Sequence, residues 1–170
     1  MRWCWHLAVV ILLLQSESVA QTLQPLWLEG GAVTALAWYN GRLYVGTNGQ
    51  GLWCYSPQEQ RWTSLGLEGI SIRAVYPHDV GPLGWCIAAG VRPSGVGADT
   101  VLIYCWTPPG SQWRPMDQGL DRERVSAIYA LDGFPDPRIC GETFAGGYWG
   151  VYRRPLGAEK WENVCWWSFA

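Results

Sequence analysis

The chain has 170 residues, of which 49% are hydrophobic and 15% are charged, and its formal net charge is −2. This weak balance offers neither the basic patch of a nucleic-acid-binding protein nor the polybasic segment of a membrane-surface protein, so we expect no nucleic-acid partner. The 13 tryptophans and 21 glycines are typical of a β-rich exported protein with many turns.

Residues 1–20 have the pattern of a secretory signal peptide. Arg2 is a positive n-region, residues 7–14 are a short apolar core, and Ser18-Val19-Ala20 is a small-residue cleavage signal. An uncleaved membrane anchor is the alternative, but the apolar run is short for a span that needs roughly 20 residues. We expect cleavage, a secreted or otherwise extracytoplasmic mature chain, and no stable membrane span in it.

The cysteines of the mature chain are odd in number and have no C-x-x-C spacing; they are Cys54, Cys86, Cys105, Cys140 and Cys165. No histidine cluster accompanies them, so we expect no metal and no cofactor. Exported chains can form disulfides, and strand cysteines can also be small buried hydrophobes. The sequence leaves both alternatives open and does not give the pairing.

Residues 33–66 form the clearest unit, with a lone strand near 22–28 before it. Asn40-Gly41 and the cluster Asn48-Gly49-Gln50-Gly51 predict tight hairpin turns, because glycine and asparagine tolerate positive φ. The strands predicted around these turns are 33–38, 42–47, 52–56 and 62–65. Strand alternation places Leu52 and Cys54 on one face of the third strand and Trp53 and Tyr55 on the other.

The same design recurs twice further along the chain. The aligned strand starts are Val33-Thr34-Ala35-Leu36, Ile72-Arg73-Ala74-Val75 and Val125-Ser126-Ala127-Ile128. Second strands are predicted at 85–91 and 138–143, and third strands at 101–107 and 150–154. Each fourth strand opens with a tryptophan: Trp62, Trp113 and Trp161. The units span about 33–66, 72–119 and 125–164, and residues 165–170 form a tail.

Four-stranded antiparallel units repeating at roughly 40 to 50 residues predict an all-β fold, a partial β-propeller of about three four-stranded blades. Radial repetition buries both faces of each blade, whereas a β-sandwich, the alternative, has no need of an internal repeat. Closed propellers typically have about 4 to 8 blades. We therefore expect a fragment of a larger propeller, or a partial one completed by association.

The stretch L-Y-V-G-T-N-G-Q-G-L-W followed by Trp62 resembles the Asp-box, or sialidase-type, propeller repeats, a group that includes photosystem II assembly-factor-like, sortilin-type and xyloglucanase propellers. The usual hairpin reads S-x-D-x-G-x-x-W, and this chain departs from it. Before Trp62, Pro57 and Glu59 replace the aspartate and the glycine, and Pro108 and Ala158 are further departures. The resemblance implies a propeller with structural, degenerate hairpins.

No catalytic constellation stands out in the sequence. His78-Asp79 is the only neighbouring histidine–carboxylate pair of the mature chain, lacks a G-x-S-x-G partner, and is expected in a loop after a strand ending near Tyr76. Aspartates near turns more often cap their own backbone than act on glycosidic bonds; these are Asp79, Asp99, Asp117, Asp121, Asp132 and Asp136. The arginines Arg122, Arg124, Arg153 and Arg154 are interpreted as solvated surface.

We therefore expect an exported, non-catalytic propeller module that binds a protein or a glycan. The alternative is a fragment of a sialidase- or xyloglucanase-type glycoside hydrolase. We also predict that Trp62, Trp113 and Trp161 occupy equivalent places and bury their rings against a neighbouring strand or blade. Trp161 is expected to be the least buried, because no blade follows it.

Overall fold

The computed structural model describes residues 31–79, 85–93, 101–106, 112–133, 142–148, 150–155 and 158–166, without the side chains of Asp79, Trp85, Cys86 and Trp166. The predicted signal peptide, the strand near 22–28 and residues 167–170 lie outside the described residues. Within the described part, no helix is long and apolar enough to cross a bilayer.

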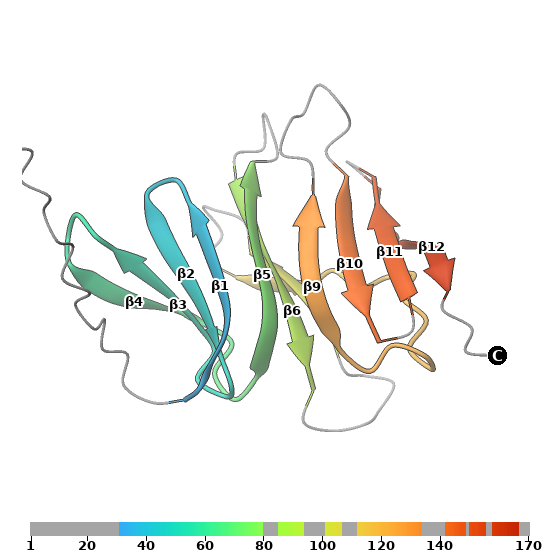
Figure 1. The fold of residues 1–170 in the computed structure, drawn as a ribbon, viewed down its shortest axis with the longest axis horizontal. Coiled ribbons are helices and arrows are strands. Elements are labelled where there is room, and N and C mark those ends of the chain that lie inside the picture. Colours follow the sequence, from blue (N-terminus) through green and yellow to red (C-terminus); the bar gives the residue numbers. More distant parts are fainter. Residues whose placement is uncertain are drawn as a thin grey trace, which may run out of the picture.

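Within the described residues, twelve strands form three antiparallel four-stranded sheets, which are three blades of a partial β-propeller (Figure 1). Blade 1 contains β1 (Val33–Tyr39), β2 (Arg42–Thr47), β3 (Leu52–Ser56) and β4 (Arg61–Gly66). Blade 2 contains β5 (Ser71–Asp79), β6 (Trp85–Arg92), β7 (Ile103–Trp106) and β8 (Trp113–Pro115). Blade 3 contains β9 (Ile128–Gly133), β10 (Thr143–Gly147), β11 (Gly150–Arg154) and β12 (Glu162–Trp166).

The strands of each blade pair in sequence order. In blade 1 the predicted hairpin turn is present, because Asn40 and Gly41 have φ values of 48° and 72° and Tyr39 pairs with Arg42 across it. The predicted alternation in β3 is also confirmed, since Leu52 and Cys54 are buried whereas Trp53 and Tyr55 are half-buried.

The blades pack through their first strands: β5 contacts β1 and β2, and β9 contacts β5 and β6. One apolar core fills the junction of blades 1 and 2, with Leu52, Ile72 and Ile87 fully buried in it. A second core fills the junction of blades 2 and 3, around Ile103, Ile128 and Tyr152. Blades 1 and 3 therefore lie at opposite ends of the described structure (Figure 1).

The third blade begins later than the sequence alignment indicated. β9 starts at Ile128, so the residue equivalent to Ile72 is Ile128 and not Val125. Val125 and Ala127 are buried, which gives them the appearance of a strand, but Val125 N–H donates to the carbonyl of Asp121 in a turn. The predicted strand 138–143 likewise overlaps β10 only at Thr143, and β12 includes two residues that the sequence assigned to a tail.

Candidate functional site

A tryptophan ties each blade to the one before it. Trp113 Nε1 donates a hydrogen bond to the carbonyl oxygen of Leu65 at 2.6 Å, and Trp161 Nε1 donates one to that of Met116 at 2.6 Å. Each acceptor lies three residues after the tryptophan of its own blade. The two junctions therefore use the same contact between equivalent positions, which confirms the alignment of the tryptophans.

The expected order of burial among the tryptophans was wrong. Trp161 is only 3% exposed, whereas Trp62 and Trp113 are half-buried. The reason is the direction in which the rings point. The rings of Trp113 and Trp161 face the preceding blade, so blade 2 covers Trp161. Trp62 instead lies in blade 1 against Tyr55 of the neighbouring strand, with ring centroids 5.0 Å apart.

A second repeated contact places an isoleucine on a strand glycine. A Cβ added to Gly46 would lie 2.6 Å from Cγ2 of Ile72, and a Cβ added to Gly90 would lie 2.7 Å from Cγ2 of Ile128. No side chain larger than hydrogen fits at these two positions without displacement. Glycine in a strand often marks such a close approach of another element. We call these positions glycine seats.

Blade 3 has both the strand glycine and the residue three positions after the tryptophan, but no described blade follows it to contact them. Gly146 pairs with Ala130 as Gly46 pairs with Ala35, but among the described atoms a Cβ on Gly146 would meet Cβ of Ala130 alone, at 3.4 Å. Val164, three residues after Trp161, occupies the place of Leu65, and its side chain is 47% exposed.

The register supports the equivalence of Val164 and Leu65. β4 is shifted against β3 between Leu52 and Trp53, and β12 is shifted against β11 between Val151 and Tyr152. Such bulges leave one residue out of the ladder, and at Leu65 the carbonyl released in this way accepts the bond from Trp113.

Blade 1 presents an apolar row on the face turned away from blade 2. Cross-strand pairs place Trp38 opposite Leu43, Leu43 opposite Tyr55, and Tyr55 opposite Trp62. We call these four residues the blade 1 row. Trp38 is 63% exposed, and so is Leu36 on the same face of β1. Of these four residues, the sequence identified only Trp62 as a recurring feature. The Asn40-Gly41 turn could have predicted the start of the row, because it sets the register that places Trp38 opposite Leu43.

The first residue of blade 1 is similarly exposed. Val33 is equivalent to Ile72 and Ile128, since each stands two residues before the alanine that pairs with the glycine of its own blade. Ile72 and Ile128 are completely buried in glycine seats, whereas Val33 is 53% exposed.

The outward face of blade 3 is more polar. Phe144 lies opposite Asp132 and Arg153, and Arg153 lies opposite Glu162; we call these four residues the blade 3 row. Arg153 forms ion pairs with Glu162 at 3.0 Å and with Glu142 at 3.7 Å. The guanidinium thus bridges two carboxylates on this face, and the three side chains together keep one negative charge.

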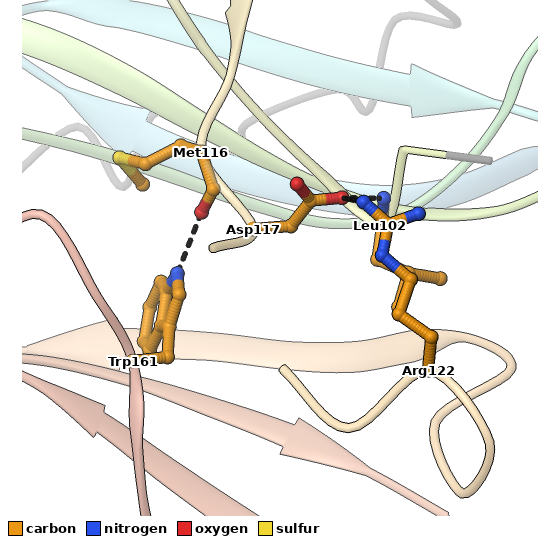
Figure 2. Close-up of polar contacts among 5 residues, drawn as sticks. All are labelled: Leu102, Met116, Asp117, Arg122 and Trp161. Atoms are coloured by element: carbon orange, nitrogen blue, oxygen red, sulfur yellow. Dashed lines mark hydrogen bonds and ion pairs between the residues drawn. The ribbon is translucent and has the colours of Figure 1, made fainter. Parts of the chain in front are cut away.

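A buried aspartate strengthens the junction of blades 2 and 3. Asp117 Oδ2 accepts hydrogen bonds from the backbone N–H of Leu102 and from Arg122 Nη2, each at 2.8 Å. Figure 2 shows both donors at one oxygen of this carboxylate, beside the bond from Trp161 to Met116. Asp117 therefore holds distant segments together, rather than capping its own backbone.

The other predicted polar positions have local roles. Asp121 and Asp132 accept bonds from the N–H groups of Glu123 and Gly133, as expected of turn aspartates. His78 is in β5 and not in a loop: its ring stacks on Tyr76 at 4.6 Å. Asp99 and Asp136 lie outside the described residues. The four arginines include ion-pair partners of Asp117, Asp121, Glu142 and Glu162.

Burial favours the neutral forms of two titratable side chains in blade 1, whose pKa values it raises. Burial raises the pKa of the Cys54 thiol, and burial, more than the neighbouring Cys54, raises the pKa of Tyr44 to about 12. Nucleophilic cysteines need a lowered pKa, so Cys54 has the properties of a core residue. Cys54 and Cys165 form no disulfide in the described structure. In the described ranges, no group of three potential metal ligands comes together.

No protein-family model matches the chain, and no curated protein sequence matches it significantly. Solved structures do match its fold. The extracellular domain of a one-component system from B. thetaiotaomicron is 16% identical with a TM-score of 0.59; the match covers 84% of this chain and 18% of that one. The computationally designed Ika4 protein is 17% identical with a TM-score of 0.52, and the match covers 84% of this chain and 78% of that one. At these identities the similarity shows the fold alone.

Proposed function

We propose that this chain is an exported, non-catalytic β-propeller module that binds a macromolecular partner, a protein or a glycan, through the open face of blade 1. The observation that carries the proposal is the blade 1 row, an apolar cross-strand series that ends in Trp38 at 63% exposure. Large exposed apolar patches mark interaction sites. A protein is favoured over a glycan, because Leu36 and Leu43 add aliphatic surface that sugar rings do not require.

Two further observations support this function. The matching domain from B. thetaiotaomicron is extracellular, which agrees with the signal-like segment at residues 1–20. The equivalent tryptophans favour descent from Asp-box repeats in which only the tryptophan persists, and this kinship is part of the proposal. We also propose that the chain acts without a cofactor.

The hydrolase alternative has less support. Glycoside hydrolysis requires two carboxyl groups that face one glycosidic bond. Asp117 is buried and bound to Arg122 and to Leu102 N–H, while Glu142 and Glu162 share Arg153. To act as a catalytic acid or nucleophile, each of these carboxylates would have to break its ion pair or hydrogen bond with a structural partner.

The test compares binding with turnover in the secreted full chain. We expect no release of product from sialyllactose or xyloglucan oligosaccharides. We expect Trp38→Ala to abolish binding in a screen of glycans and purified extracellular proteins, whereas Arg124→Ala, a side chain 61% exposed in the loop between blades 2 and 3, leaves it unchanged. Robust glycoside turnover, or binding that is insensitive to Trp38→Ala, would reject the proposal.

A further inference from the structure

We propose that the partner of the blade 1 face is a second copy of this chain, bound head to tail, with blade 1 of one copy packed on blade 3 of the other. This inference rests on the proposed function, because it names the partner of the same face. The inference follows from comparing the outward faces of blades 1 and 3 with the two junctions between blades within the chain. Equivalent residue positions occur on both outward faces and in both junctions.

The first complementary pair is Val33 and Gly146. Within the chain, Ile72 enters the seat at Gly46 and Ile128 enters the seat at Gly90. Blade 3 offers a third seat at Gly146, where a Cβ would meet only Ala130, and blade 1 offers an exposed β-branched residue at the equivalent position, Val33. A head-to-tail contact would repeat the existing packing with valine in place of isoleucine.

The second complementary pair is Trp62 and Val164. Trp113 and Trp161 each donate to a carbonyl three residues after the tryptophan of the preceding blade. The same rule pairs the indole of Trp62 with the carbonyl of Val164, which lies at the same bulge as Leu65. The two complementary pairs involve both the inner and the outer strands, so they fix the orientation of one blade on the other.

The remaining surfaces are chemically compatible. Packing like that within the chain brings the blade 1 row against the blade 3 row, and so places Arg153 near Tyr55 and the tryptophans. A guanidinium over an aromatic ring is favourable. Because Arg153 already pairs with Glu142 and Glu162, its guanidinium would not be buried without a counter-charge.

The contact also explains how a ring could close. A head-to-tail interface is heterologous, and it generates a ring when the rotation between copies closes. Two copies of the three described blades give six blades, which lies within the usual range of about 4 to 8 for closed propellers. Both ends of each copy would then be covered in a symmetric dimer.

The experiment measures the mass of the full chain by sedimentation and native mass spectrometry. We expect the wild type to be a dimer. Trp38→Asp and Val33→Arg alter the blade 1 end and Gly146→Val alters the blade 3 end. We expect each to weaken self-association by roughly tenfold or more, as for central interface residues. Far-UV and near-UV circular dichroism show which variants are folded. If one of the two blade 1 variants does not fold, the other still tests the blade 1 end. Arg124→Ala is the matched control and should remain dimeric.

Mixing the variants gives the decisive result. An equimolar mixture of Trp38→Asp and Gly146→Val contains one intact pair of ends, so we expect a one-to-one heterodimer from two monomers. A monomeric wild type, or variants that stay dimeric, would overturn the head-to-tail proposal. So would a mixture that stays monomeric. In each of these cases, Trp38-dependent binding of another protein or a glycan would leave the proposed function intact.

Discussion

Ile128 of the third blade lies directly over Gly90 of the second, so close that a Cβ on the glycine would be 2.7 Å from Cγ2 and 3.0 Å from Cβ of the isoleucine. The backbones of the two blades approach one another through this contact. It repeats the contact of Ile72 with Gly46, so the spacing between blades is set by the absence of a side chain at one strand position.

Gly90→Ala is therefore expected to destabilise the protein. The added methyl group overpacks a fully buried junction, and overpacking typically costs about 1 to 3 kcal/mol. Urea denaturation followed by circular dichroism measures the loss. Gly146→Ala is the matched control in the equivalent strand of blade 3, where the methyl group meets only Ala130 at 3.4 Å. Equal effects of the two substitutions on the isolated monomer would contradict the interpretation.

Trp161→Phe should cost more stability than Trp62→Phe. The first change leaves the carbonyl of Met116 without its indole donor at a partly buried contact, and an unsatisfied group costs up to about 1 to 3 kcal/mol when it is buried. The second change acts on a half-buried ring on the open face of blade 1. Thermal unfolding of monomeric protein compares the two, and a larger effect at Trp62 would count against the assigned directions of the rings.

Tyr44 should make the protein sensitive to high pH. Burial raises its pKa from 10.0 to about 12, so the folded state favours the protonated phenol. Its contribution is complete below pH 10 and is lost as the pH rises through about 12. The loss is on the order of 3 kcal/mol, by the usual conversion of a pKa difference into stability. Urea denaturation at a series of pH values measures it, and Tyr44→Phe should flatten the profile over this window.

Asp117→Ala should destabilise the junction of blades 2 and 3. The substitution removes the acceptor of the Leu102 N–H and the ion-pair partner of Arg122, and a bond to a charged group contributes about 1.5 to 3 kcal/mol. Asp121→Ala is the control, because its pair with Arg124 is largely exposed and such pairs contribute about 0 to 1 kcal/mol. Chemical denaturation that ranks Asp121→Ala as the more damaging change would refute the role given to Asp117.

The first blade could be predicted from the sequence because its turns contain the asparagine and glycine residues that are typical of tight hairpins. Asn40-Gly41 fixes a hairpin, and the predicted strands 42–47 and 52–56 coincide with β2 and β3. The third blade has no such signal at its start. Val125 and Ala127 resemble a strand because they are buried within a turn. The true start at Ile128 is set by its contact with Gly90, 38 positions earlier in the chain, and no local sequence pattern marks that contact.

The candidate site was less accessible to sequence reasoning. Gly46 and Gly146 stand at equivalent strand positions. Nothing in the local sequence shows that Gly46 receives an isoleucine from the next blade, whereas a Cβ on Gly146 would meet Ala130 alone among the described residues. The same applies to the tryptophans: their spacing predicts that they are equivalent, but the direction in which each ring points depends on the packing of blades. The direction of each ring explains why Trp161 is buried and why Trp62 lies on the outward face of blade 1.

The most direct test of the central claim is hydroxyl-radical footprinting of the full chain over a range of protein concentrations, with oxidation of Trp38 and Trp161 read by mass spectrometry. Trp161 is 3% exposed and should stay protected throughout. Trp38 is 63% exposed, and its oxidation should fall as concentration rises and blade 3 of a second copy covers it. Oxidation of Trp38 that is the same at every concentration, or ready oxidation of Trp161, would contradict the account.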